Sequence, residues 1–373
     1  MHRRSGHIKG KVVPVKIAAT LVTLIAGGSA GKEGPCAQIG GGIAAKVADI
    51  FCFNDTDRKK IVICGISAGF AAVFGTPIAG AIFGIEVLYI GSLMYDVLLP
   101  SFIAGITSYQ ISSALGVAYF YHPIDLVPTF SQLYFMEVVI GGMFLGLCCL
   151  LFIETIHACK KYFDRIPGWP PLKALAAGVV LVALTALFSD RYLGLGLDTI
   201  EATLNGAPVN WWDFLVKIFF TGITITFGGS GGLVTPIFFI GSTFGSLYAS
   251  IMHIDPATFS AIGMVSLLAG AANTPIAASI LAMELFGPKI APYASVACVT
   301  CFLVTGHRSV YPSQITAAMK SSSIHGNLGE EVEEVEMEFI LRQHTPTSYM
   351  FSLVSKFLSR DACKIEPKKD DET

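Results

Sequence analysis

The chain has 373 residues, of which 53% are hydrophobic and only 14% charged, and its formal net charge is −2. A soluble domain carries about 25% charged residues, so this deficit predicts a polytopic membrane protein lying in a lipid bilayer. The slightly negative net charge argues against a nucleic-acid partner. The 38 glycines lie within apolar runs, where they favour closely packed or interrupted membrane helices over a flexible linker.

The cysteines and histidines do not predict a metal site or a disulfide framework. The nine cysteines are an odd number, and most of them lie in apolar segments. Cys298 and Cys301 form a C-x-x-C pair in a hydrophobic segment that has no second pair. The sequence also lacks a nucleophile–base constellation. We therefore expect no metal, no cofactor and no enzymatic activity.

The apolar segments predict an all-helical protein with many short membrane helices. Glycine or proline separates many of these segments, and several are shorter than the ~20 residues that a full span needs. Interrupted helices are tolerated in a membrane where their ends are buried in protein or line a water-filled path, so the pattern favours a transporter or channel. The segments lie roughly at 17–30, 35–52, 60–74, 77–91, 97–116, 133–158, 173–188, 214–227, 236–252, 257–272, 275–286 and 290–305.

The polar connections between these segments are interpreted as loops, including 53–59 and 189–212. Asp213 and Lys217 flank the start of the segment 214–227. We expect these two side chains to face water or each other.

The first chemically informative motif is Gly31-Lys32-Glu33-Gly34-Pro35. Pro35 suits the first turn of a helix, where its missing N–H has no consequence. A helix start presents free N–H groups and a partial positive charge, so it attracts anions. Glu33 places an anion there already. A mobile anion would therefore compete with the Glu33 carboxylate for this position.

An internal repeat relates two halves of the chain. The spacing Gly31, Pro35, Gly40 recurs as Gly232, Pro236, Gly241. Further on, the pattern from Thr76-Pro77 to Glu86 recurs from Thr274-Pro275 to Glu284 in the same order. Paired, interrupted segments in two halves point to a substrate site between the repeats. Glutamates in apolar membrane segments are functional candidates by default, although Glu284 is interpreted as structural.

These motifs resemble the CLC family of chloride channels and chloride/proton exchangers. The family's G-[KR]-E-G-P helix start is present from Gly31 to Pro35. Its G-x-F-x-P motif is matched by Gly232-Leu233-Val234-Thr235-Pro236, with valine where phenylalanine is common. Its pore tyrosine, near the start of the last membrane helix, is matched by Tyr311. The similarity covers about residues 10–322 and predicts the CLC-like fold, an inverted repeat of short, tilted and discontinuous helices.

The resemblance implies a site for chloride and related small anions. Glu33 would be the gating residue, occupying the anion site when ionised and leaving it when protonated. Tyr311 would donate its hydroxyl hydrogen to the anion. Partial charges suit conduction, because a full buried cation would hold the anion too tightly to release it. The anion-binding residues would be Gly31, Lys32, Gly34, Pro35, Gly232, Leu233, Val234 and Tyr311.

One departure from the family pattern concerns proton transfer. Exchangers of the family commonly carry a proton-handling glutamate directly after the position of Glu86, and here that residue is Val87. The sequence therefore favours uncoupled chloride conduction, and the alternative is a chloride/proton antiporter in which Glu86 or water carries the proton. Glu86 itself has two interpretations, a water-facing role or a structural contact at a helix end. Pro35 weighs against the family's fluoride-specialised branch.

A second departure concerns the serine-bearing G-S-G-I-P loop, which precedes the glutamate motif in the family. Glu33 lies too near the first residue for this loop to be present. We expect a truncated gene model or fragment, and the alternative is a shortened protein with an impaired or inactive site.

The organisation expected from the resemblance is a membrane-spanning region followed by a polar tail. Residues 1–323 would form the CLC-like transmembrane domain, with a first repeat at about 12–116 and a second at about 173–323. Residues 324–373 would form a soluble acidic C-terminal tail, too short for CBS domains. The protein would be a multi-pass homodimer in the cell membrane.

Overall fold

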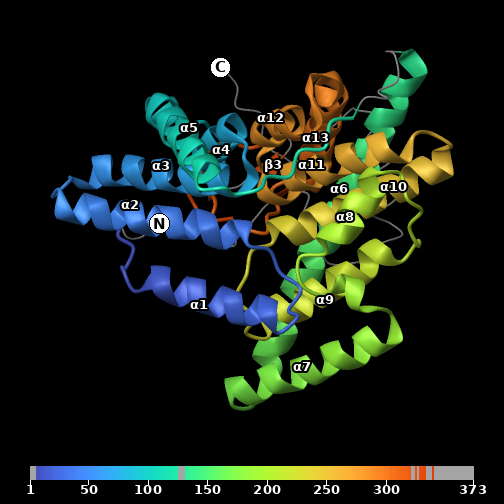
Figure 1. Ribbon diagram of the computed structural model, residues 1–373, viewed down its shortest axis with the longest axis horizontal. Coiled ribbons are helices and arrows are strands. Elements are labelled where there is room, and N and C mark those ends of the chain that lie inside the picture. Colours follow the sequence, from blue (N-terminus) through green and yellow to red (C-terminus); the bar gives the residue numbers. More distant parts are fainter. Residues whose placement is uncertain (1–5, 125–130, 321–323, 326, 333–337, 340–373) are drawn as a thin grey trace, which may run out of the picture.

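The computed structural model describes residues 6–124, 131–320, 324–325, 327–332 and 338–339. These residues form α-helices with a few short 3-10 turns and two-residue strands, which confirms the predicted all-helical class (Figure 1). The elements are α1 (Val12–Ile25), α2 (Glu33–Ile50), α3 (Asp55–Phe74), α4 (Pro77–Glu86), β1 (Tyr89–Ile90), η2 (Tyr95–Val97), α5 (Leu98–Ala114), α6 (Gln132–Arg165), α7 (Pro170–Leu187), η3 (Asp190–Tyr192), α8 (Leu197–Leu204), α9 (Asp213–Thr226), α10 (Val234–Met252), α11 (Pro256–Ala272), α12 (Pro275–Phe286), η4 (Pro288–Ile290), α13 (Ala291–Thr305), β2 (Ile315–Thr316), β3 (Ile324–His325) and β4 (Glu338–Phe339).

Two connections that were predicted as loops contain helix. The segment 53–59 contains the first turn of α3, because the Asn54 side chain accepts a hydrogen bond from the Asp57 N–H at 2.9 Å and caps the helix. The segment 189–212 contains η3 and α8. Ile200 and Leu204, one helical turn apart, are both buried in α8, so a short amphipathic pattern outweighs the overall polarity of this segment.

The two halves of the chain pack their helices in the same way. In the first half α2 lies beside α3, and in the second α10 lies beside α11 (Figure 1). Glycines let the backbones touch at both crossings. A Cβ added to Gly40 would stand 2.1 Å from the Gly65 carbonyl oxygen, and one added to Gly241 would stand 2.4 Å from the Gly263 carbonyl oxygen. Any larger residue there would push the two helices apart.

A second symmetric contact joins α4 to α12. The Glu86 carboxylate at the end of α4 accepts hydrogen bonds from the backbone N–H groups of Ile276 and Ala277, at 3.0 and 2.7 Å. The Glu284 carboxylate near the end of α12 accepts the equivalent bonds from Ile78 and Ala79, again at 3.0 and 2.7 Å. Each glutamate therefore caps the helix start of the opposite half, where N–H groups would otherwise lack partners.

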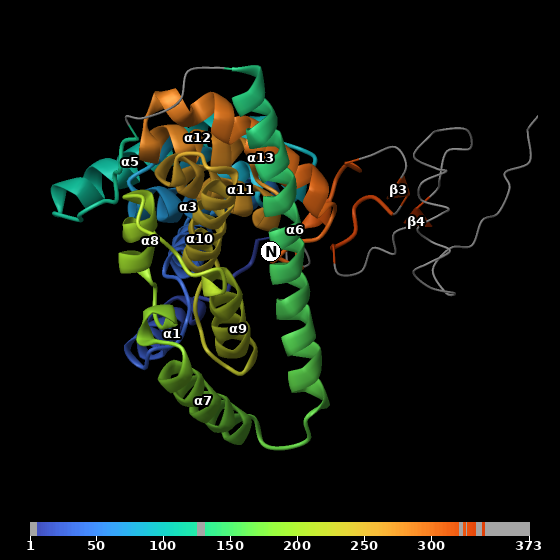
Figure 2. The same ribbon diagram turned by 90° about the vertical axis from the view of Figure 1, so that its right-hand side faces the viewer.

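Within the described part of the chain, four helices are long and apolar enough to cross a membrane: α6, α7, α10 and the segment Pro288–Thr305, which comprises η4 and α13. Helix α6 is the longest, with 34 residues, and Figure 2 shows it running along one side of the molecule toward α7. Short apolar helices such as α4 and α12 lie among them. Their ends are satisfied by protein groups, as the glutamate caps show.

After α13 the described chain turns back onto the first half. Strand β2 pairs in parallel with β1, placing Ile315 opposite Tyr89. Ile315 also bridges to Glu331 in the tail, so the start of the acidic segment lies against this ladder. Strands β3 and β4 form a second pair. Residues 340–373, which make up most of the predicted tail, lie outside the described residues.

Candidate functional site

The helix starts of α2 and α10 meet through the backbone. The N–H of Gly31 donates to the Gly232 carbonyl at 2.7 Å, and the N–H of Gly232 donates to the Gly31 carbonyl at 2.7 Å. Glycine is required for this approach, because a Cβ on Gly232 would lie 2.7 Å from the Gly34 nitrogen. The two motifs related by the repeat therefore form one site, to which both helix N-termini contribute positive potential.

The Glu33 carboxylate occupies the centre of this junction. Glu33 is 3% exposed and is the first residue of α2. The Thr235 hydroxyl, from the first turn of α10, donates a hydrogen bond to Glu33 Oε2. The backbone N–H groups of Glu33 and Thr235 are also close enough to the carboxylate to stabilise its negative charge. An anionic group is thus held by a hydroxyl and by helix-start amides rather than by a cation, which is the arrangement expected for a mobile anion.

Glu33 faces a cavity of about 420 Å³. Tyr311, Val234 and Gly34 line the same cavity, so the structure brings these predicted residues together with Glu33. Val87 also lines it. Gly31, Pro35, Gly232 and Leu233 are buried at the junction behind it, whereas the Lys32 side chain is exposed.

The environment of Tyr311 differs from the prediction, because Tyr311 does not begin a helix. No helix follows Thr305 among the residues that the structure describes. Ile315 and Thr316 enter the ladder with β1, so the backbone after Tyr311 becomes extended. The Tyr311 N–H donates to the Ser309 hydroxyl at 3.0 Å, and this short turn supports the ring in the absence of a helix.

The buried Gln314 side chain anchors the turn that carries Tyr311. Its Nε2 donates to the carbonyls of Val87 and Ala272, both at 2.7 Å. Its Oε1 accepts from the Ser309 hydroxyl at 2.5 Å and from Asn273 Nδ2 at 3.1 Å. Gln314 thus satisfies its amide completely and connects the end of α4 to the end of α11 beneath the cavity.

Two functional candidates, Thr235 and Gln314, were missed by sequence reasoning. For Thr235 a signal was present, since it lies inside the second motif, at the position that the repeat relates to Gly34. The repeat relates Glu33 itself to Val234, so the second motif provides no carboxylate at the equivalent position. The polar partner of Glu33 is instead the next residue, Thr235. For Gln314 the sequence offers no comparable signal.

The structure places the proton-pathway candidate Glu86 at a helix end. Its residue is 5% exposed, and both carboxylate oxygens are used by the amides of α12. This geometry matches the structural interpretation of Glu86 rather than the water-facing one. Val87 follows directly and provides no titratable group at the cavity wall.

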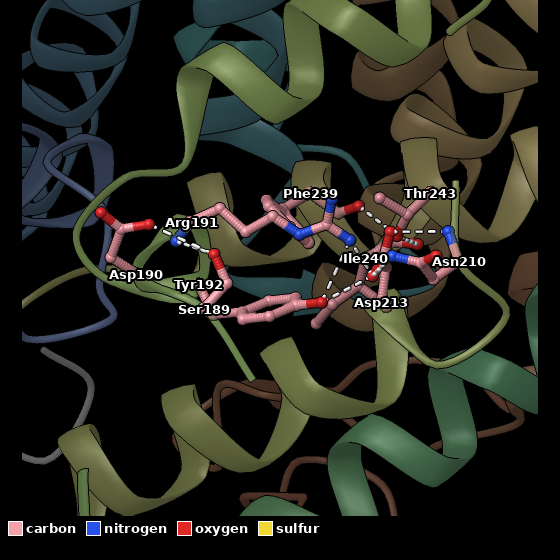
Figure 3. A network of polar contacts seen from close by, with 9 residues as sticks. All are labelled: Ser189, Asp190, Arg191, Tyr192, Asn210, Asp213, Phe239, Ile240 and Thr243. Carbon is pink, nitrogen blue, oxygen red and sulfur yellow. Dashed lines mark hydrogen bonds and ion pairs between the residues drawn. The ribbon is translucent and has the colours of Figure 1, made fainter. Parts of the chain in front are cut away.

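Asp213 and Lys217 were expected to face water or each other, and this expectation is wrong. Both residues are 0% exposed. Asp213 forms an ion pair with Arg191 and accepts hydrogen bonds from Tyr192 Oη at 2.6 Å and Asn210 N at 2.9 Å (Figure 3). The Lys217 ammonium instead donates to the Tyr192 and Gly194 carbonyls, at 2.9 and 3.1 Å. The segment 189–212 provides these partners, which explains why that segment is folded.

The family model for the voltage gated chloride channel matches residues 1–306. The chain belongs to the CLC family. This confirms the resemblance inferred from the glutamate motif, and with it an integral membrane location and a role within a family of anion transport proteins.

Relatives within the CLC family differ in their named activities. The chain is 40% identical over 329 residues to the chloride/fluoride channel protein of Pseudomonas syringae pv. tomato, covering 86% of this chain and 72% of that protein. It resembles the crystal structure of a CLC-type fluoride/proton antiporter with 30% identity and a TM-score of 0.79, covering 81% and 77% of the two chains. A slow cyanobacterial Cl⁻/H⁺ antiporter shares the fold, with 21% identity and a TM-score of 0.70 over 80% and 73% of the chains.

Proposed function

We propose that this protein conducts chloride or a related small anion, and that the Glu33 carboxylate gates the path by competing with that anion. The observation that supports this proposal is the position of Glu33, buried where the two helix starts meet and open to the cavity. The carboxylate occupies the place that the partial charges of both helices make favourable for an anion. A permeating anion binds there when the carboxylate leaves.

The contacts of Glu33 suggest how it is held and released. In the closed state the ionised carboxylate accepts the Thr235 hydrogen bond. Protonation removes the negative charge that the helix starts attract, so the side chain is held less strongly and the anion takes its place. Tyr311, on the wall of the same cavity, would then donate to the anion. Acid therefore opens the path.

The direct test is pH-dependent flux from liposomes that contain the purified protein. Chloride flux should rise as pH falls, and Glu33→Gln should remove most of this dependence, since glutamine mimics the protonated carboxyl. Glu201→Gln is the matched control, because Glu201 is an exposed carboxylate on α8, outside this cavity. Unchanged pH dependence in Glu33→Gln would rule out the gating role.

Uncoupled conduction is favoured over proton exchange by Val87. Val87 lines the cavity without a titratable group, and Glu86 beside it is fully engaged in its helix cap. Anion/proton exchange is the second candidate function, because two of the similar structures are of antiporters. A combined chloride and proton flux assay separates the two, because only an exchanger lets a chloride gradient drive protons uphill. We expect no uphill proton movement.

The choice of anion should be tested with both chloride and fluoride. Pro35 weighs against a fluoride specialist, whereas two similar proteins carry fluoride in their names. The Thr235 hydroxyl at the anion position is a strong, compact donor, and such a donor favours small anions with high charge density. Measuring both fluxes in the same liposomes gives the preference directly.

The predicted homodimer, the limits of the two repeats and the domain boundary near residue 323 remain proposals. A homodimer would give twice the protomer mass of 39.7 kDa in light scattering, after correction for detergent.

A further inference from the structure

A second cavity of about 530 Å³ lies away from the Glu33 site, between the last turns of α6 and the segment that follows α13. The two cavities share no lining residue in the described part of the chain. The side chains around the second cavity are mostly polar or charged. The charged ones are Glu154, Lys160, Lys161, Asp164, Arg165 and Arg308.

The lining of this cavity is cationic. Two lysines and two arginines line the cavity together with two carboxylates. With both histidines neutral, the lining therefore has a surplus of two positive charges. Arg308 forms an ion pair with Glu154, so part of the charge is already neutralised. Lys161 and Arg165, one helical turn apart on α6, are exposed and accessible to a ligand. Such a concentration of cations around a concave surface attracts multiply charged anions.

The position of the cavity along α6 places it at the membrane surface. Helix α6 has 34 residues, and a helix of that length is about 51 Å long. The hydrocarbon core of a bilayer is about 30 Å thick, so the ends of α6 extend beyond it. The basic residues occupy the last turns of α6, at the end next to α7 (Figure 2). Basic pockets in this layer lie at the depth of lipid phosphate groups.

His307 adds a neutral donor to the cavity wall. Its Nε2 accepts a hydrogen bond from the Lys320 N–H at 2.9 Å, so in the neutral ring the proton is on Nδ1. Burial and the Lys320 charge lower the pKa of His307, which favours this neutral form. Nδ1 is buried and has no hydrogen-bond partner among the described residues.

We propose that this cavity binds the phosphate groups of a multiply charged anionic ligand. Lys161 and Arg165 would contact phosphate oxygens through charge-assisted hydrogen bonds. The volume exceeds what a single inorganic ion needs and is typical of pockets for larger ligands, such as an inositol phosphate headgroup or a nucleotide. Ser309 connects the cavity to the pore, because it lines the wall while its hydroxyl accepts the Tyr311 N–H.

Binding is tested with the full-length protein in neutral detergent by microscale thermophoresis. The lipid probes are dioctanoyl phosphatidylinositol bisphosphate and dioctanoyl phosphatidylglycerol, and the soluble probes are inositol trisphosphate and ATP. The variants are Lys161→Gln/Arg165→Gln and the charge reversal Lys161→Glu. The matched control is Lys46→Gln/Lys59→Gln, which removes two exposed lysines of α2 and α3 that lie outside the cavity.

We expect saturable binding of at least one phosphate probe, weakened about 10-fold or more by the cavity variants and unchanged in the control. Binding of the inositol lipid without binding of the soluble probes identifies a headgroup site, whereas binding of inositol trisphosphate or ATP identifies a site for free phosphates. The proposal is overturned if no probe binds saturably, or if cavity and control variants bind equally. Normal gel filtration and an unchanged apparent melting temperature would show that the variants are folded.

Discussion

The two places where the halves of this protein meet differ in symmetry. At the contact between α4 and α12, Glu86 and Glu284 make the same pair of hydrogen bonds with the same distances. At the junction of α2 and α10, the backbone bonds of Gly31 and Gly232 are symmetric but the side chains are not. Glu33 on one helix start faces the Thr235 hydroxyl on the other.

This difference separates structural support from function. Both glutamates of the symmetric contact use both carboxylate oxygens to cap helix starts. The asymmetric junction opens on a cavity and holds a single carboxylate, which a mobile anion replaces in the proposed mechanism. A carboxylate in an apolar membrane segment is therefore not sufficient evidence of a transport role, since Glu86 and Glu33 have different surroundings.

The largest effect is expected from breaking the symmetric contact. Glu86→Ala leaves two helix-start amides without partners, and each buried unsatisfied donor costs about 1–3 kcal/mol. Glu284→Ala should destabilise the protein less, because the Glu284 side chain is only half-buried and its bond to the Ile78 N–H is open to water, whereas Glu86 is 5% exposed. Apparent melting temperatures in detergent measure both losses, and Glu86→Gln should restore part of the first. A larger loss in Glu284→Ala would contradict this ranking.

A smaller loss of stability, with a large loss of flux, is expected from crowding the asymmetric junction. Gly232→Ala places a Cβ 2.7 Å from the Gly34 nitrogen and 2.9 Å from Pro35 Cδ. Such overpacking costs about 1–3 kcal/mol and would displace Glu33 from the helix start. Gly178→Ala on α7 is the control, because nothing lies within 4 Å of the added Cβ. Wild-type flux in Gly232→Ala would show that the close approach is unnecessary.

The most selective change is the removal of the Thr235 hydroxyl. Thr235→Val deletes a hydrogen bond to a charged group, worth about 1.5–3 kcal/mol, so the closed position of Glu33 is weakened. Chloride flux at neutral pH should rise about 10-fold, since about 1.4 kcal/mol corresponds to that factor. Thr235→Ser retains the hydroxyl and should behave like the wild type. If Thr235→Val and Thr235→Ser show the same flux, the hydroxyl does not hold the gate.

The sequence predicted the helical fold and the junction around Glu33 well, for a physical reason. Glycine and proline at fixed spacing specify helix starts and close contacts locally, and the repeat then places the two starts together. Contacts made by distant side chains were not predictable in this way. Gln314 joins Val87 to Ala272 through its amide, and no local pattern specifies such a connection. Asp213 and Lys217 were misplaced because their partners come from a polar segment that looked like a loop.

In the proposed mechanism, Glu33 and the permeating anion compete for one position. Isothermal titration of chloride, or of fluoride if fluoride carries the larger flux, measures this competition at pH 5 and pH 8. Competition predicts that the wild type binds the anion more tightly at pH 5, where the carboxyl is more often protonated. Glu33→Gln should bind tightly at both pH values. Equal affinity of wild type and Glu33→Gln at both pH values would show that Glu33 and the anion do not compete.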